Sequence, residues 1–427
     1  MKEENTARDT PRNKNPYSAC RSLGSPRLQP STAAVRQVDS TSSFDLFLTT
    51  KLPSPNSQFS ILPSIQTVLQ DAWYPDHRVR QGKQLPILPS SAQRTDNTQG
   101  PRELKVTDLA DPTPARDQYV VGVHAAATNF FDLLQIAGKY QHQPPLPWIS
   151  GSEFSGVILS VPSALPNNRT PKYKVGDRVF GASQGGYATK VAAKEEVLLP
   201  VPNGWSYFDA AGLFVTAPTS YGALVTRAGV KKGDWVLVHA AAGGVGLAAV
   251  QIAKAFGATV IATAGTKRKL EVAKSFGADY AVDYTDPAWP DIVKKLTPKN
   301  RGVDIVYDPV GMIDKSTKCI AWNGRLLVIG FAAGVIEKVA MNKVLLKNIS
   351  IVGLHWGAYA INEPGKIPEV WEGIFKLIDE GKFRGTVFTD KEFVGLDAVP
   401  EALESLGSRG TWGKVVVKVP QEGQSKI

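Results

Sequence analysis

The stretch His239–Gly246 constrains the fold of this chain more than any other, because it joins an apolar strand pattern to a helix through small residues. The residues before it, Trp235–His239, form a short apolar run that is typical of a buried strand. The residues after it, Leu247–Phe256, are rich in Ala and have helical periodicity. The sequence therefore predicts a strand, a glycine turn and a helix in direct succession.

The small residues of this turn have separate physical roles. Ala240, Gly243 and Gly246 let the backbone turn tightly, let phosphate oxygens approach main-chain N–H groups and let the helix pack closely on the strand. Gly244 and Val245 open the helix, whose first N–H groups and positive dipole end favour an anion. The pattern indicates a dinucleotide pyrophosphate site. A glycine-rich turn without a ligand stays open as the alternative, because Ala240 stands where the usual motif has its first glycine.

Strands alternate with helical patterns from residue 220 to about residue 360. The expected strands are Trp235–His239, Thr259–Thr263, Tyr280–Val282, Val303–Tyr307, Leu326–Ile329 and Ile349–Leu354. Alternating strands and helices, with a glycine turn after the first strand, predict a doubly wound parallel sheet, the Rossmann arrangement.

The region before residue 220 reads as a β domain, which we expect to be a partly open β-barrel over residues 73–219. Its expected strands are Leu104–Val106, Tyr119–His124, Gly156–Ser160, Asp177–Phe180, Ala188–Val191 and Val197–Leu199, with a turn at Asp111–Asp117. Helices at Ile367–Asp379 and Ala398–Ser405 precede a final strand at Lys414–Val419. We expect residues 361–427 to rejoin the barrel.

Composition removes several classes of function. No apolar run approaches the roughly 20 residues that a membrane-spanning helix needs. The formal charge of +10 is spread along the chain, without basic runs interleaved with aromatics, which argues against nucleic-acid binding as the main role. Cys20 and Cys319 are too few for a disulfide framework or a Cys-rich zinc site and fit a reducing compartment.

Residues 1–72 read as a leader without a fold of their own. The first 60 or so are rich in Ser, Thr, Pro, Asn and Arg and lack apolar periodicity, so we expect disorder. The basic, acid-free stretch Thr10–Val38 resembles a mitochondrial transit peptide, whereas Glu3, Glu4 and Asp9 and four prolines argue against one. Cytoplasmic and mitochondrial locations both stay open.

Eight motifs together resemble the zinc-free quinone oxidoreductase, or zeta-crystallin-like, branch of the medium-chain dehydrogenase/reductase family. They are Ala127–Asp132, Gly138–Tyr140, Pro145–Pro147, Gly151–Gly156, Val175–Val179, Ala240–Gly246, Val303–Gly311 and Gly324–Gly330. The resemblance covers about Pro101–Pro420 and implies a Rossmann domain beside a GroES-like catalytic domain, the partly open barrel. The family's first barrel strand is not recognisable between Leu62 and Gly100.

The resemblance also bears on metal. Zinc-dependent members of the family ligate catalytic zinc with a Cys and a His at positions that match Asn129 and Ser152 here. Neither residue provides a thiolate or an imidazole, so we expect no metal. Glu153 reads as a buried carboxylate that bonds to backbone rather than as a lone metal ligand.

The end of the second predicted parallel strand bears on the cofactor. NAD-selective sites place an acid there, but Ala262–Lys269 contains none. Hydroxyls at Thr263 and Thr266 and the cations Lys267–Lys269 suit the 2′-phosphate of NADPH instead. A solvated polar helix start is the alternative.

The resemblance assigns further cofactor contacts. It places Lys269, Tyr284 and Arg409 near the adenosine phosphate, and Gly330 and Phe331 beside the cofactor. Edge packing is the alternative for Tyr284.

At the nicotinamide end, the resemblance implies two residues. Asn129 matches an asparagine that bonds the nicotinamide ribose, and Tyr140 matches a tyrosine near the substrate; we expect both to be catalytic. Asn129 could instead cap a helix that starts at Phe130, and Tyr140 could be a surface turn residue.

The resulting hypothesis is an NADPH-dependent reductase of quinones or α,β-unsaturated carbonyls. Enoyl-thioester reduction is the runner-up, and a nicotinamide-binding sensor, RNA-binding or crystallin-like structural protein is the non-enzyme alternative. The resemblance also implies a homodimer, in which the apolar stretch Ser350–Trp356 pairs across a two-fold axis or else forms an internal edge strand.

Overall fold

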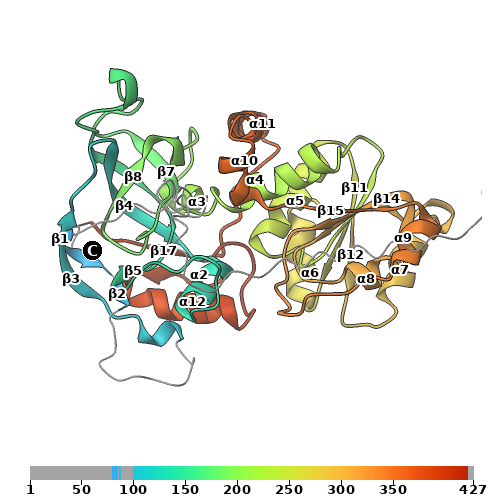
Figure 1. The fold of residues 1–427 in the computed structure, drawn as a ribbon. Coiled ribbons are helices and arrows are strands. Elements are labelled where there is room, and N and C mark those ends of the chain that lie inside the picture. The colour runs from blue at the N-terminus through green and yellow to red at the C-terminus, as the bar shows by residue number, and fades with distance from the viewer. Residues whose placement is uncertain (1–78, 85, 88–99, 422–427) are drawn as a thin grey trace, which may run out of the picture. The chain divides into compact units, whose positions relative to one another are not determined.

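The protein is described here from a computed structural model, which covers residues 79–84, 86–87 and 100–421. The predicted leader, with its transit-peptide composition, lies outside these residues. Two larger sheets organise the described chain, one mixed and one parallel (Figure 1).

The mixed sheet is built mainly from the first half of the chain. The elements of this half are β1 (Val79–Gln84), β2 (Pro86–Ile87), η1 (Pro101–Glu103), β3 (Thr107–Pro112), β4 (Gln118–Ala127), α2 (Phe130–Ile136), β5 (Trp148–Ile149), β6 (Glu153–Ser160), η2 (Pro166–Asn168), β7 (Arg178–Ala182), β8 (Lys190–Lys194), η3 (Glu195–Val197), β9 (Leu198–Pro200), α3 (Tyr207–Ala211) and α4 (Thr216–Tyr221), which continues into the π-helical η4 (Gly222–Arg227). The order in the sheet is β16-β17-β4-β6-β7-β9, with β8 paired to β4. This sheet does not close on itself, in line with the predicted partly open barrel.

The start of the barrel differs from the sequence prediction. Leu104–Val106 was expected to be a strand and Asp111–Asp117 a turn, whereas β3 runs over Thr107–Pro112. The reason is tertiary pairing, because β3 forms an antiparallel pair with β1 (Val79–Gln84), a strand that the apolar pattern does not reveal. The strand expected at Ala188–Val191 is likewise displaced, to β8.

The parallel sheet contains the glycine turn. Its region comprises β10 (Trp235–Val238), α5 (Gly244–Ala255), β11 (Thr259–Ala264), α6 (Lys267–Ser275), β12 (Tyr280–Asp283), α7 (Trp289–Leu296), η5 (Pro298–Asn300), β13 (Val303–Asp308), α8 (Ile313–Ser316), β14 (Ile320–Val328), α9 (Met341–Lys347) and β15 (Ser350–Gly353). The strand order β12-β11-β10-β13-β14-β15 is that of a doubly wound sheet, in which ligands bind where the order reverses, here between β10 and β13.

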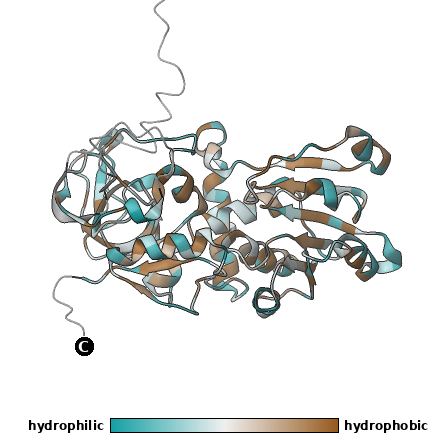
Figure 2. Ribbon diagram, turned by 90° about the horizontal axis from the view of Figure 1, so that it is seen from below, coloured by the Kyte–Doolittle hydropathy of each residue, from teal (hydrophilic) through white to brown (hydrophobic). Residues whose placement is uncertain are grey.

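Apolar side chains cover both faces of the parallel sheet. In β10, Val236 and Val238 join the core that contains α5, whereas Leu237 joins a second core with residues of α7 and α8. Successive strand residues point to opposite faces, so burial on both sides requires the near-continuous apolar runs seen in the sequence. Figure 2 shows these strands coloured mainly as hydrophobic.

The last part of the chain returns to the mixed sheet. It contains η6 (Trp356–Ala358), α10 (Tyr359–Asn362), α11 (Lys366–Asp379), β16 (Phe393–Val394), η7 (Leu396–Ala398), α12 (Val399–Gly407) and β17 (Val416–Lys418). Strand β17 pairs antiparallel with β4, with Val416 opposite Ala127. The residues just before β17 therefore lie beside the strand that leads to Asn129. Among the described residues, no helix combines the length and the apolarity needed to cross a bilayer.

Candidate active site

The glycine turn has a backbone that admits only small side chains. Ala240 adopts a left-handed conformation with a φ of 45°. A Cβ atom at Gly246 would lie 2.3 Å from the Ala240 carbonyl oxygen. Gly243 precedes the first turn of α5, where Gly244 and Val245 are partly exposed. The turn thus presents backbone N–H groups at a helix N-terminus, which fits a pyrophosphate group.

The residues predicted for the adenosine end lie together. Thr266 caps α6 and accepts a hydrogen bond from the Lys269 backbone N–H at 3.3 Å. The Lys269 ammonium donates to the Arg409 carbonyl at 2.6 Å. Burial, and then the charge of Arg409, lower the pKa of Lys269. The Tyr284 ring lies over Gly265, where a Cβ would be 3.2 Å from Tyr284 Cε2.

A second cation at the start of α6, Arg268, is already engaged in an ion pair. Arg268 pairs with Asp390 at 2.8 Å, whereas the Lys269 ammonium donates to a neutral carbonyl, that of Arg409. Lys269 is therefore better placed than Arg268 to meet an added anion. Arg409 donates to the Ala332 carbonyl at 2.9 Å and so connects this cluster to the residues after β14.

A pocket of about 350 Å³ lies at the carboxyl ends of β14 and β15. Its lining includes the predicted residues Gly330 and Phe331, together with Leu354 and His355. Ligands of doubly wound sheets bind at this edge. The lining is mostly apolar and includes one imidazole, that of His355.

Asn129 lies in a buried polar cluster. Its Nδ2 donates to Glu153 Oε2 at 3.1 Å, and its Oδ1 accepts from Lys414 Nζ at 2.7 Å. Asn129 is also the N-cap residue of α2, and its backbone N–H donates to Asp132 Oδ2 at 2.8 Å. Asn129 therefore occupies the cap position while its side chain faces Glu153 and Lys414, and its contact with the nicotinamide ribose stays a prediction. Glu153 also accepts from the Val215 backbone N–H at 2.9 Å, as expected for a buried carboxylate bonded to backbone.

Tyr140 lies beside this cluster. Its ring stacks on Phe131, with centroids 5.5 Å apart. Burial, followed by the nearby charge of Asp132, raises the pKa of Tyr140 above its ordinary value, which is itself well above neutral pH. Burial also raises the pKa of Asp132 to about 7, although its Oδ2 accepts a 2.6 Å hydrogen bond from the Tyr187 hydroxyl.

The donor set does not fit catalytic zinc. Asn129 is held by Lys414 and Glu153, and Ser152 offers only a hydroxyl, which is buried and makes no hydrogen bond. The described residues include no group of three or more His, Cys, Asp or Glu that could hold a metal ion. No step of the chemistry is therefore assigned to zinc.

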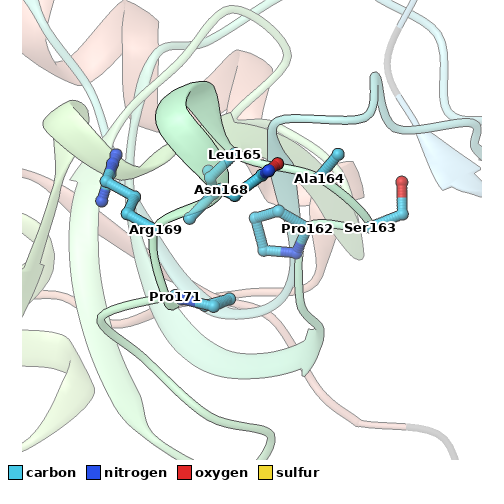
Figure 3. A pocket seen from close by; sticks show the side chains of 7 residues that line it. All are labelled: Pro162, Ser163, Ala164, Leu165, Asn168, Arg169 and Pro171. Atoms are coloured by element: carbon cyan, nitrogen blue, oxygen red, sulfur yellow. The ribbon is translucent and has the colours of Figure 1, made fainter.

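A second pocket, of about 220 Å³, lies away from these residues in the β6–β7 connection (Figure 3). It is lined by Pro162, Ser163, Ala164, Leu165, Asn168, Arg169 and Pro171. Because Arg169 pairs with Glu195, the pocket's one charged group is already engaged. It contains none of the predicted site residues.

Sequence reasoning missed two residues of the site. Lys414 reads as the first residue of a β-strand, and only its position between Gly413 and an apolar run could have marked it as buried. His355 follows an apolar strand and gives no local signal, because its place depends on the neighbouring end of β14.

Comparison with known proteins agrees with this geometry. Residues 115–203 match the family described as "Alcohol dehydrogenase GroES-like domain", and residues 244–378 match "Zinc-binding dehydrogenase". "Quinone oxidoreductase-like protein 2 homolog" of Nematostella vectensis is 37% identical over 309 residues, or 71% of this chain and 82% of that protein. "Quinone oxidoreductase" of Homo sapiens is 34% identical over 260 residues, or 60% and 77%. The crystal structure of Escherichia coli quinone oxidoreductase complexed with NADPH matches with a TM-score of 0.67 and 27% identity, covering 79% of this chain and 99% of that one.

Proposed function

The chain belongs to the medium-chain dehydrogenase/reductase family, in its quinone oxidoreductase branch, and on that premise we propose that it is a zinc-free, NADPH-dependent reductase of quinones or α,β-unsaturated carbonyls. It is an oxidoreductase that uses a nicotinamide cofactor. The choice of NADPH rests on the end of β11, where Thr266, Lys269 and Arg409 meet and where the stretch Ala262–Lys269 contains no Asp or Glu. A 2′-phosphate would receive hydrogen bonds and positive charge there, whereas a bare ribose would lack its usual carboxylate partner.

Different residues around the proposed cofactor position bind the cofactor and polarise the substrate. The N–H groups of the glycine turn bind the pyrophosphate, and Gly330 and Phe331 border the nicotinamide ring. When bound, NADPH supplies a hydride to the β-carbon of an enone or to a quinone. Tyr140, protonated at neutral pH, donates a hydrogen bond to the acceptor oxygen and favours the negative charge that develops there. The proton that completes the two-electron reduction comes from solvent or through that phenol.

Turnover with a panel of acceptors tests the proposal. Purified protein is mixed with NADPH and separately with quinones, enones and enoyl thioesters, and the loss of NADPH absorbance is followed. We expect oxidation with quinones or enones. Oxidation with enoyl thioesters alone would establish the runner-up reaction, and NADPH binding without any turnover would favour a sensor or structural protein.

A matched variant separates chemistry from binding. Tyr140→Phe keeps the ring that stacks on Phe131 and removes only the hydroxyl. It should lower kcat about 10-fold or more while leaving the Kd for NADPH unchanged. An unchanged kcat would remove Tyr140 from the reaction.

We also propose that the protein is a homodimer. Strand β15 (Ser350–Gly353) is the outer strand of the parallel sheet, so its free edge can pair with a second copy. Large apolar side chains are exposed near it, among them Leu345, Leu346 and Ile351. A second copy would cover this surface, because soluble monomers rarely leave such side chains clustered in water.

A further inference from the structure

Lys414 is buried beside Asn129 and Glu153, and the proposed reaction assigns it no role. Only 5% of its side chain is exposed, and its Nζ donates to the Thr128 carbonyl at 2.9 Å, to Asn129 Oδ1 at 2.7 Å and to Glu153 Oε2 at 2.8 Å. An ammonium group has three hydrogens, so all of its donors are satisfied. Removing a charge from water is costly, and Glu153 with two neutral acceptors offsets that cost.

These contacts fix how the Asn129 amide is turned. An ammonium can only donate, so the oxygen of Asn129 must face Lys414. Its nitrogen then faces Glu153 and donates one of its two hydrogens to that carboxylate. A flipped amide would place N–H against the ammonium and oxygen against the carboxylate. One Nδ2 hydrogen of Asn129 is thereby left with a defined direction.

The stem of Lys414 also touches the glycine turn. A Cβ at Gly244, the first residue of α5, would lie 2.8 Å from Lys414 Cδ, and one at Gly212 would lie 2.9 Å from Lys414 Cβ. The preceding residue, Gly413, donates its N–H to the Ala242 carbonyl at 2.6 Å. Two successive residues therefore contact both the predicted pyrophosphate cradle and the residue predicted at the nicotinamide ribose.

We propose that Lys414 is a positioning residue, which holds the Asn129 amide in the one orientation that offers an N–H to the nicotinamide ribose and keeps that amide in register with the glycine turn. This inference rests on the proposed function. It assigns to the Lys414 ammonium a contribution to NADPH affinity that is exerted through Asn129, while Met at position 414 would keep the apolar contact with Gly244.

A double-mutant cycle tests it with a readout that does not require turnover. The Kd for NADPH is measured by fluorescence titration for the unchanged protein, Lys414→Met, Asn129→Ala and the double variant. Each single change should weaken NADPH binding about 10-fold, as for the loss of one hydrogen bond to a ligand. The double variant should bind NADPH with a Kd no higher than that of the single variant with the higher Kd. The reason is that, without Asn129, Lys414 has no amide to orient.

Lys269→Ala serves as the matched control, since it removes a lysine at the adenosine end. In the Lys269→Ala/Lys414→Met double variant, the fold-increase in the Kd for NADPH should be the product of the two single fold-increases, because the two lysines act on different parts of NADPH. If the Lys414 and Asn129 losses also multiply, or if Lys414→Met binds NADPH like the unchanged protein, the positioning role is overturned.

Lys414→Met leaves Glu153 buried without its cation and can prevent folding. In that case the cycle is repeated with Glu153→Gln in all four proteins, which removes the uncompensated charge and keeps an acceptor for Asn129 Nδ2. The same non-multiplying result is expected, and multiplying losses would again overturn the inference. Failure of the unchanged protein to bind NADPH would instead contradict the proposed function.

Discussion

At the scale of single residues, Lys269 should decide which nicotinamide cofactor binds. Lys269→Glu places a carboxylate where we expect the 2′-phosphate, and the repulsion should weaken NADPH binding about 100-fold. NADH has no phosphate there, so its Kd should change far less. Fluorescence titration with both cofactors measures the difference.

Lys274→Glu is the control for this change in charge, because Lys274 lies in the last turn of the same helix. It changes the net charge by the same amount and should leave the preference for NADPH intact. Equal weakening of NADPH and NADH by Lys269→Glu would exclude the 2′-phosphate assignment.

Asp132 should make stability depend on pH. Burial raises its pKa from 3.8 to about 7, so the folded protein holds a proton that the unfolded chain releases between those values. The associated stability is fully present below about pH 4 and is lost as pH rises through about 7, with an upper bound of about 4 kcal/mol. Asp132→Asn removes this loss, so its Tm relative to the unchanged protein should rise by roughly 5 °C between pH 5 and pH 8.

Asp177→Asn is the matched control, because Lys174 lowers the pKa of this partly exposed carboxyl. Its Tm relative to the unchanged protein should not rise over the same range. A constant Tm difference for Asp132→Asn would show that Asp132 is ionised in both states.

Single residues also show where sequence reasoning ends. Asn129 could be singled out because it lies in a recognisable motif. Lys414 could not, because its acceptors Thr128, Asn129 and Glu153 are more than 250 positions away in the chain. Only the pairing of β17 with β4 brings them together.

At the scale of elements, the two kinds of sheet differed in how well they could be predicted. The parallel strands, buried on both faces, stand out as apolar runs, and the predicted doubly wound sheet is confirmed. Strand β3 (Thr107–Pro112) contains two Asp and one Pro, so its pattern suggested a turn. Its identity as a strand comes from pairing with β1, which local propensity cannot show.

The free edge at β15 leads to a prediction about assembly. Leu345 and Leu346 in α9 are more than 70% exposed, so replacing both with Glu removes no buried packing. Light scattering should give about twice the 46.0 kDa chain mass for the unchanged protein and about that mass for the double variant.

Val175→Glu provides the control for this experiment, because Val175 is an exposed valine of the β domain. It should leave the dimer intact. A monomeric unchanged protein, or a Leu345→Glu/Leu346→Glu variant that remains dimeric, would contradict the proposed interface.

At the scale of the whole molecule, the chemistry should not depend on metal. Asn129 and Ser152 supply no ligand that zinc prefers, and the predicted NADPH contacts come from backbone, hydroxyl and cationic groups. Dialysis against a chelator should leave both the rate of NADPH oxidation and the Tm unchanged. Elemental analysis should find far less than one zinc per chain, and a rate that falls on chelation and recovers with added zinc would contradict this.

The burial of Lys414 makes it unlike a surface lysine toward reagents that modify amines. With its three hydrogens donated and its stem between Gly212 and Gly244, the Nζ offers no lone pair to an electrophile while these contacts hold. The rate at which Lys414 is acylated, followed by mass spectrometry, would therefore report how often the segment Gly413–Lys414 separates from the glycine turn.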